Sequence, residues 1–297
     1  MKVIVTGASG VLGTAVYDAF KSAGHDTLGL AFSRPSGELK KVDLLNQGET
    51  EEVFVWFKPD WVIHCAAERK PDVAEKDPEG TKKLNIAVPE HLAKLSVKLG
   101  FTIVYISTDY VFDGTSPPYV PSAGTNPLNL YGQTKRDGEI ATLGVEGAKA
   151  IVLRVPVLYG PAPSNADSAI NILLDVVQDQ SGKTYKMDHY QTRYPTNVID
   201  IAGFLVRLAS TPNVQPPPIL HYTAPEPFTK YEICLVFARI LGLSHKHIIP
   251  QADEPAPGST PRPKDTQLYV RETEDLGVEG GLGTTGFEEW WEQRLKK

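Results

Sequence analysis

The chain contains little cysteine and no long apolar run. Only Cys65 and Cys234 are present among 297 residues, too far apart to suggest a disulfide framework or a zinc motif. We therefore expect a reducing compartment and no metal site. No run of ~18 apolar residues offers a membrane span, and strand-like sequence begins at Lys2, which leaves no room for a leader. These absences predict a cytoplasmic protein.

Charge of one sign is not concentrated anywhere along the chain. The 30 basic and 36 acidic residues give a net charge of -6, and the basic residues form no strong block. A surface that binds duplex nucleic acid needs such a block. The sequence therefore favours a small molecule as the partner and argues against a nucleic acid.

Short β-rich runs alternate with longer helical patterns in the first half of the chain. With 41% hydrophobic residues, a chain of this length can bury a large core. Strands that alternate with helices of this length indicate βαβ crossovers, and nearly continuous apolar strands fit a sheet covered on both faces. We predict an α/β, doubly wound parallel sheet of the Rossmann kind. The expected strands span residues 2–7, 26–33, 60–67 and 101–108, and the expected helices include 11–24 and 88–100.

The pattern loosens after residues 150–161 into proline-rich loops with fewer regular elements. We expect residues 1–160 to form the Rossmann domain, and residues 161–297 to form mainly a smaller substrate-binding lobe interwoven with it. Residues 251–266 form a long loop, and loops of this length in compact domains often serve function, so this loop could close over a site. The expected elements of the second half are a helix near 168–179, a strand near 219–225 and a helix near 229–243.

A glycine-rich loop, TGASGVLG, follows the first predicted strand and opens the first predicted helix. Such a loop turns sharply, brings its backbone close to a pyrophosphate and aims a helix N-terminus at the negative charge. The alternative, a turn without a ligand, fits this position less well. The GxxGxxG spacing resembles the extended short-chain dehydrogenase/reductases, whose members work on nucleotide sugars. The residues expected to contact a dinucleotide are Gly7, Ser9, Gly10, Val11, Leu12 and Gly13.

The end of the second predicted strand indicates which nicotinamide cofactor is bound. A carboxylate there binds the ribose 2′-hydroxyl of NAD, whereas a guanidinium accommodates the 2′-phosphate of NADP. The sequence has Ser33 and Arg34 and no acid until Glu38, so we predict NADP, with NADPH preferred over NADH. The alternative is that Arg34 is a solvated loop arginine. The superfamily resemblance implies further cofactor contacts from Asp43, Leu44, Ala66 and Ala67.

A tyrosine and a lysine lie four residues apart in the segment NLYGQTKRDGE. If this segment is helical, Tyr131 and Lys135 lie on one face. A tyrosine, with a free pKa of about 10, can act as a general acid if a neighbouring cation stabilises its phenolate. Thr108 ends the preceding predicted strand beside Ser107, and would meet the pair at the carboxyl edge of the sheet. Although a lone YxxxK match is common, its order after the glycine loop favours catalysis over a chance surface pair.

Five segments together resemble the dTDP-4-dehydrorhamnose reductase family: TGASGVLG, STDYVFDG, YGQTK, RYPTNVIDIA and RPKDTQL. Members reduce the 4-keto group of a deoxysugar nucleotide. The resemblance implies catalytic roles for Thr108, Tyr131 and Lys135, and cofactor contacts from the last two. Arg262 matches an arginine of a closing loop and could bind a diphosphate bidentately. The resemblance also assigns a further set to the sugar-nucleotide site: Arg69, Asp72, Asp188, Gln191 and Tyr194.

Three segments, HCAAERKPDVAEKDPE, LNLYGQTKRDGE and MDHYQTRYPT, are still more similar to the regulatory β subunits of methionine adenosyltransferase, which bind NADP. Two hypotheses therefore stay open. One is an NADPH-dependent reductase of a dTDP- or UDP-linked 4-keto-6-deoxy sugar. The other is a non-catalytic subunit that binds NADP and a methionine adenosyltransferase catalytic subunit. Those regulatory subunits carry longer ends, so a chain that starts on a strand and finishes at FEEWWEQRLKK favours the reductase.

Several details stay open at this level. Glu68 and Lys76 are candidates for the acid/base pair of an additional 3,5-epimerisation, since their loop has no cysteine. We expect His189 to be a hydrogen-bonded loop histidine, because no carboxylate or metal partner is evident. Arg193 is either a diphosphate contact or a solvated residue. The sequence determines neither the nucleotide base nor the oligomeric state.

Overall fold

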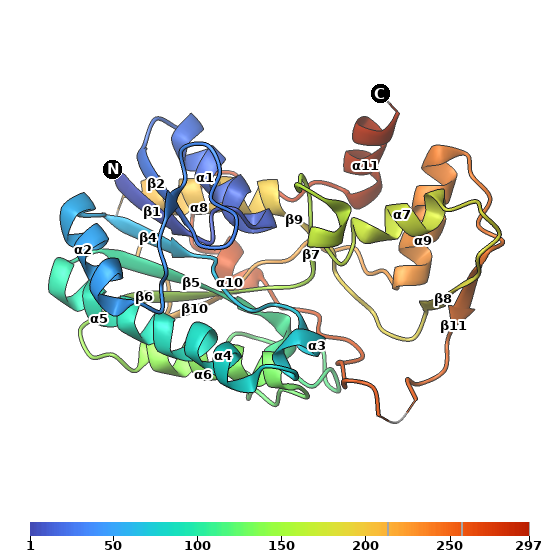
Figure 1. Cartoon of the computed structure of the whole chain (residues 1–297), viewed down its shortest axis with the longest axis horizontal. Helices are drawn as coiled ribbons and strands as arrows, with labels where there is room; N and C mark the ends of the chain where they lie inside the picture. Colours follow the sequence, from blue (N-terminus) through green and yellow to red (C-terminus); the bar gives the residue numbers. More distant parts are fainter. Residues whose placement is uncertain (213, 257, 297) are drawn as a thin grey trace.

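Seven parallel strands form the central sheet, in the order β10-β6-β5-β4-β1-β2-β3 (Figure 1). The computed structural model describes residues 1–212, 214–256 and 258–296. The predicted doubly wound parallel sheet is confirmed. Most of the predicted strands end a few residues early, because the chain leaves the sheet there. The strands are β1 (Lys2–Thr6), β2 (Asp26–Ala31), β3 (Lys40–Lys41), β4 (Trp61–His64), β5 (Thr102–Thr108), β6 (Lys149–Val155) and β10 (Ile219–His221).

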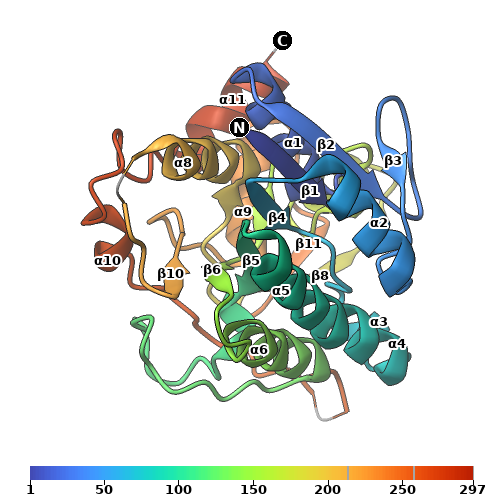
Figure 2. The same cartoon turned by 90° about the vertical axis from the view of Figure 1, so that its left-hand side faces the viewer.

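Helices cover both faces of the sheet, as Figure 2 shows. Alternate residues of β1 pack on opposite sides: Val3 and Val5 belong to the cluster with α1 and α8, whereas Ile4 belongs to the cluster with α2 and α5. This two-sided burial explains why the strands are apolar throughout. One face carries α1 (Val11–Ser22) and α8 (Val198–Ser210); the other carries α2 (Gln47–Phe57), α5 (Val88–Leu99) and α6 (Leu130–Leu143), with α3 (Pro71–Ala74), α4 (Pro78–Lys82) and the π-helical turn Lys83–Ala87 leading into α5.

The C-terminal part of the chain builds a second apolar cluster beside the sheet, on the right in Figure 1. There α7, α9 and α11 pack around Tyr159, Phe237 and Trp291. The same part of the chain also supplies β10 and α8 to the main sheet. The remaining elements are β7 (Leu158–Tyr159), α7 (Ile172–Gln178), β8 (Tyr185–Asp188), β9 (Thr196–Asn197), α9 (Lys230–Leu241), β11 (Ile248–Gln251), α10 (Arg271–Glu274), α11 (Phe287–Leu295) and the 3-10 turns η2 (Asp109–Val111) and η3 (Asn165–Asp167).

Side-chain caps fix where the functional helices begin. The Asn129 amide oxygen accepts a hydrogen bond from Gly132 N at 2.9 Å, which starts α6 and makes the predicted tyrosine and lysine segment helical. Thr229 and Glu232 form a capping box at the start of α9. None of the described helices is both long enough and apolar enough to cross a membrane.

A buried ion pair between Arg154 and Glu139 ties β6 to α6 beneath the carboxyl edge of the sheet. The guanidinium donates to both carboxylate oxygens, at 2.9 and 2.7 Å, and both side chains are less than 5% exposed. Ser107 Oγ donates to the same carboxylate, and Arg154 also donates to the Pro121 carbonyl. Because all these groups are paired in a low-dielectric region, removal of one partner leaves a buried charge without compensation.

We predict that Glu139→Ala lowers the free energy of unfolding by about 3–5 kcal/mol, because it leaves the Arg154 guanidinium buried and unpaired. Urea denaturation measures this loss. Glu79→Ala, which breaks the exposed pair with Lys82, is the control and should lower the free energy of unfolding far less. Equal losses in the two variants would contradict the importance of the buried pair.

Candidate active site

A cavity of about 690 Å³ lies at the carboxyl edge of the sheet. Open α/β sheets bind ligands where the strand order reverses, and here that point lies between β1 and β4. The loops that follow β1, β2, β4, β5 and β6 all line the cavity. It contains every residue predicted to contact the cofactor: Gly7, Ser9, Gly10, Val11, Leu12, Gly13, Ser33, Arg34, Asp43, Leu44, Ala66, Ala67, Tyr131 and Lys135.

The glycine loop brings the start of α1 to the wall of the cavity. Gly7 has a φ of +66°, and a Cβ at this position would lie 2.8 Å from Ala66 N, so only glycine allows β1 and β4 to approach this closely. A Cβ on Gly13 would lie 2.1 Å from Gly7 O. Gly10, the N-cap of α1, offers no side-chain cap, and the first turn has no acidic residue. The first N–H groups of α1 are thus suited to an anion such as a diphosphate.

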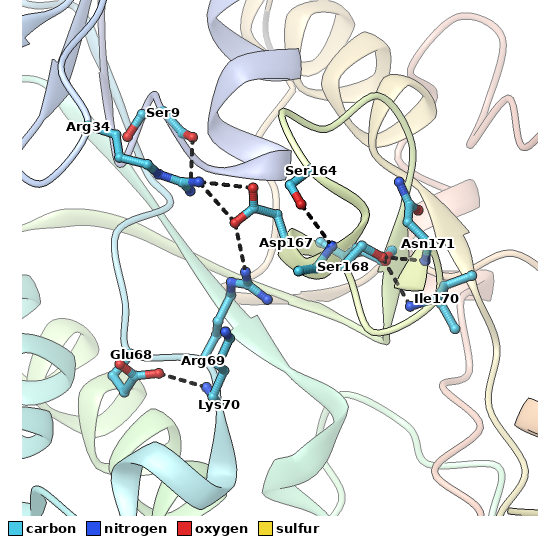
Figure 3. A network of polar contacts seen from close by, with 12 residues as sticks. Ser9, Arg34, Glu68, Arg69, Lys70, Ser164, Asp167, Ser168, Ile170 and Asn171 are labelled. Atoms are coloured by element: carbon cyan, nitrogen blue, oxygen red, sulfur yellow. Dashed lines mark hydrogen bonds and ion pairs between the residues drawn. The ribbon is translucent and has the colours of Figure 1, made fainter. Parts of the chain in front are cut away.

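The outer end of the cavity is lined by the segment that follows β2. Ser33 and Arg34 are exposed there, and Asp43 Oδ1 accepts a hydrogen bond from Leu45 N at 3.0 Å. Arg34 is not merely solvated. Its Nη1 donates to both carboxylate oxygens of Asp167, at 3.0 and 2.9 Å, and Nη2 lies 3.5 Å from Ser9 O (Figure 3).

Thr108 and Tyr131 lie together at the inner end of the cavity. Burial raises the pKa of Tyr131 well above its usual value, while the Thr108 hydroxyl and the Arg69 guanidinium act in the opposite direction. Thr108 Oγ1 donates to Asp109 Oδ1 at 3.1 Å and accepts from Tyr110 N at 3.2 Å. The Thr108 hydroxyl is thus held in place beside the phenol of Tyr131.

The ammonium group of Lys135 lies against β5. It donates to the Ile106 carbonyl at 2.6 Å and lies 3.9 Å from the centroid of the Tyr105 ring. Burial lowers the Lys135 pKa to about 7, although Glu139 opposes this effect. The cation that most lowers the Tyr131 pKa is Arg69, not Lys135. Stabilisation of the Tyr131 phenolate by Lys135 stays a prediction.

Four cationic side chains gather in the remaining part of the cavity: Arg69, Arg193, Lys230 and Arg262. Arg262 Nη2 pairs with Asp72 Oδ2 at 2.9 Å. Burial lowers the pKa of Lys230, and the neighbouring Arg262 and Arg193 lower it further. Positive charges this close repel one another, so each makes it less favourable for its neighbours to be charged. A bound anion would offset this repulsion.

The segment after Thr260 is hydrogen-bonded to the start of α6, to Arg193 and to η2. Asn129 Nδ2 donates to the Pro261 carbonyl at 2.8 Å, Arg193 Nη1 donates to the Pro263 carbonyl at 3.0 Å, and the Thr266 hydroxyl donates to Asp109. Residues 261–266 of the predicted long loop are therefore held in place by these bonds. Pro257 of that loop lies outside the described residues.

Four residues predicted to bind substrate do not line the cavity. Asp188 Oδ1 accepts from the backbone N–H groups of Tyr190 and Gln191, and so shapes the turn. Gln191 is buried and accepts from Arg193 Nη2 at 2.6 Å. Tyr194 is also buried, which raises its pKa to about 12.

Asp72 likewise is absent from the lining, but it holds Arg262, which lines the cavity. Substrate contact by these four residues stays a prediction.

Sequence reasoning missed four charged residues that line the cavity: Asp77, Asp109, Asp167 and Lys230. Asp109 follows Thr108 directly in STDYVFDG, so its place at the strand end could have indicated it. Lys230 follows the capping residue Thr229 at the start of a predicted helix. Asp167 gave no local signal, because its partner Arg34 is 133 residues away in the chain.

Comparisons with known proteins agree on one family. The RmlD substrate binding domain model matches residues 1–289. Subunit beta of methionine adenosyltransferase 2 from Xenopus laevis is 43% identical over 281 residues, which cover 93% of this chain and 83% of that protein. Both resemblances predicted from the sequence are thereby confirmed as similarities.

Two solved structures share the whole fold. A crystal structure of a dTDP-4-dehydrorhamnose reductase from Clostridium acetobutylicum superposes with a TM-score of 0.84 at 26% identity, covering 100% of this chain and 99% of that one. The dTDP-4-dehydrorhamnose reductase of Bacillus anthracis, in complex with NADP, has a TM-score of 0.82 at 24% identity, covering 99% and 98%.

We predict that buried Lys135 makes the stability of the ligand-free protein depend on pH. Its folded pKa of about 7 lies below the usual lysine value, so the unfolded chain binds more protons between the two. The free energy of unfolding should therefore rise with pH from about 7 to 10, relative to Lys135→Met, by at most about 1.4 kcal/mol per pH unit. Denaturation across this range measures the difference. Lys98→Met, an exposed control on α5, should keep the wild-type slope, whereas parallel wild-type and Lys135→Met profiles would contradict the prediction.

Proposed function

Because the chain belongs to the RmlD substrate binding domain family, we propose that it is an NADPH-dependent reductase of a 4-keto-6-deoxy sugar nucleotide linked to dTDP or UDP. The observation that carries the proposal is the convergence of three features in one cavity. These are the uncapped start of α1, the pair of Thr108 and Tyr131, and a group of cations that includes Arg262.

The cavity's residues fit a nicotinamide dinucleotide that carries a 2′-phosphate. The first N–H groups of α1 would hold the diphosphate, and Arg34 would hold the 2′-phosphate. Asp43 and Leu44 would border the adenine, and Lys135 would hold the ribose beside the nicotinamide. A solved protein of the same fold contains NADP, which supports this choice.

The inner end of the cavity is suited to protonating a carbonyl oxygen as it is reduced. The bound nicotinamide supplies the hydride. Tyr131 would donate its phenolic proton to the oxygen of the developing alkoxide. Thr108 lies beside the phenol and lowers the pKa of Tyr131, which would ease the loss of that proton. Arg69 would stabilise the tyrosinate that remains.

The cationic part of the cavity supports a nucleotide sugar as the substrate. A sugar linked to a nucleoside diphosphate carries two adjacent phosphates, and guanidinium groups bind such oxygens bidentately. Arg262 and Lys230 would meet these phosphates. Arg193 would act mainly through structure, because its donors are directed to Gln191, Thr192 and Pro263.

We predict that the protein oxidises NADPH when dTDP- or UDP-4-keto-rhamnose is present, followed as loss of absorbance at the nicotinamide band. Tyr131→Phe should lower kcat by about 100-fold or more, because it removes the proton donor. Tyr269→Phe, at an exposed tyrosine outside the cavity lining, should retain wild-type kcat. A wild-type rate no higher than that of Tyr131→Phe would refute the reductase proposal.

A second candidate function is a regulatory subunit that keeps NADP as a structural ligand and binds a methionine adenosyltransferase. The observation that favours it is the 43% identity to subunit beta of that enzyme over 93% of the chain, against 26% to the solved reductase. This function needs the dinucleotide site but no turnover. In that case the Thr108, Tyr131 and Lys135 set would be inherited without being used.

If this second function holds, the protein should form a complex with a methionine adenosyltransferase catalytic subunit at micromolar concentrations. Size-exclusion chromatography would show coelution, and the synthetase rate would change on mixing. Tyr131→Phe should bind as well as the wild type, because its role is confined to the cavity. Separate elution together with an unchanged synthetase rate would exclude the regulatory candidate.

A further inference from the structure

The turn that carries Asp167 reaches across the cavity to the predicted cofactor arginine. Asp167 ends η3, a turn capped by Ser164 and located between β7 and α7. Figure 3 shows its carboxylate between two arginines from separate loops. Both oxygens accept from Arg34 Nη1, and Arg69 Nη2 lies 3.9 Å from Oδ1. The Asp167 side chain is only 14% exposed, whereas each arginine is nearly half exposed.

This contact occupies the guanidinium that a 2′-phosphate would need. Arg34 Nη1 is shared between the two Asp167 oxygens, and Nη2 points toward the Ser9 carbonyl of the glycine loop. Ser9, Arg34 and Asp167 all line the cavity. A phosphate arriving at Arg34 would therefore meet a carboxylate already in place.

A carboxylate and a phosphate at one guanidinium compete in two ways. They share the same donors, and their negative charges repel at the few ångströms that separate two ligands of one arginine. A phosphate that binds Arg34 through Nη1 must therefore displace Asp167. Arg69 can keep the displaced carboxylate, because it already lies beside Oδ1. A dinucleotide without the 2′-phosphate can bind without displacing Asp167.

We propose that Asp167 is a specificity-determining residue that weakens binding of 2′-phosphorylated dinucleotides by competing for Arg34. The inference rests on the proposed NADP site and deepens it. Asp167 lowers the preference for NADP over NAD that Arg34 would otherwise confer. If Asp167 instead oriented Arg34 for the phosphate, Asp167→Asn would weaken the binding of a 2′-phosphorylated nucleotide rather than tighten it.

The test is isothermal titration of the whole protein with 2′,5′-ADP and with 5′-AMP, which differ only in the 2′-phosphate. Asp167→Asn should tighten 2′,5′-ADP binding by about two- to fivefold at low salt and leave 5′-AMP unchanged. The gain should shrink as salt rises. Asp167→Glu, which keeps the charge, should not show the gain.

Two further variants isolate the contact with Arg34. In an Arg34→Ala background, Asp167→Asn should no longer tighten 2′,5′-ADP, because the contested guanidinium is gone. Asp275→Asn removes the same charge from an exposed pair with Arg271, outside the cavity lining, and should leave both affinities at the wild-type level.

The outcomes separate this inference from the proposed function. If no form of the protein prefers 2′,5′-ADP to 5′-AMP, the NADP site itself is refuted. If the wild type prefers 2′,5′-ADP but Asp167→Asn binds it equally or more weakly, the site stands and the competition is refuted. A gain that survives in the Arg34→Ala background would also refute the competition.

Discussion

The close approach of β1 and β4 at their carboxyl ends is the constraint on which the site depends. Gly7 can pass the backbone of Ala66 only without a side chain, and Gly13 packs in the same way on Gly7. These contacts set the direction of α1, whose first N–H groups then point into the crevice where the strand order reverses. The position of the cavity, with the start of α1 in its wall, follows from that geometry.

The sequence predicted the parallel sheet and the residues that line the cavity around the glycine loop because their signals are local. A glycine loop between a strand and a helix, or a tyrosine one turn before a lysine, needs only neighbouring residues to be recognised. The helices and the strand predicted from local pattern in the second half of the chain are also present. They are shorter than expected, since α7 begins only at Ile172 and β10 already ends at His221.

The rest of the site arises from contacts between distant parts of the chain. The ion pair of Arg34 with Asp167 and the bond from Thr266 to Asp109 join segments more than 130 residues apart. The position of the Lys135 ammonium group also could not be predicted from the sequence pattern. Its spacing from Tyr131 is that of a catalytic pair, but the carbonyl of Ile106 and the ring of Tyr105, both on β5, determine where its ammonium group lies.

Asn129 connects the two halves of the molecule through opposite atoms of one amide. Its oxygen begins the helix that bears Tyr131, and its nitrogen holds the backbone of the segment that contains Arg262. An aspartate caps a helix as well as an asparagine does, but it has no N–H with which to hold a second carbonyl. The helix start alone therefore does not account for an amide at this position. The amide makes the ordering of the segment with Arg262 and the placement of Tyr131 depend on a single side chain.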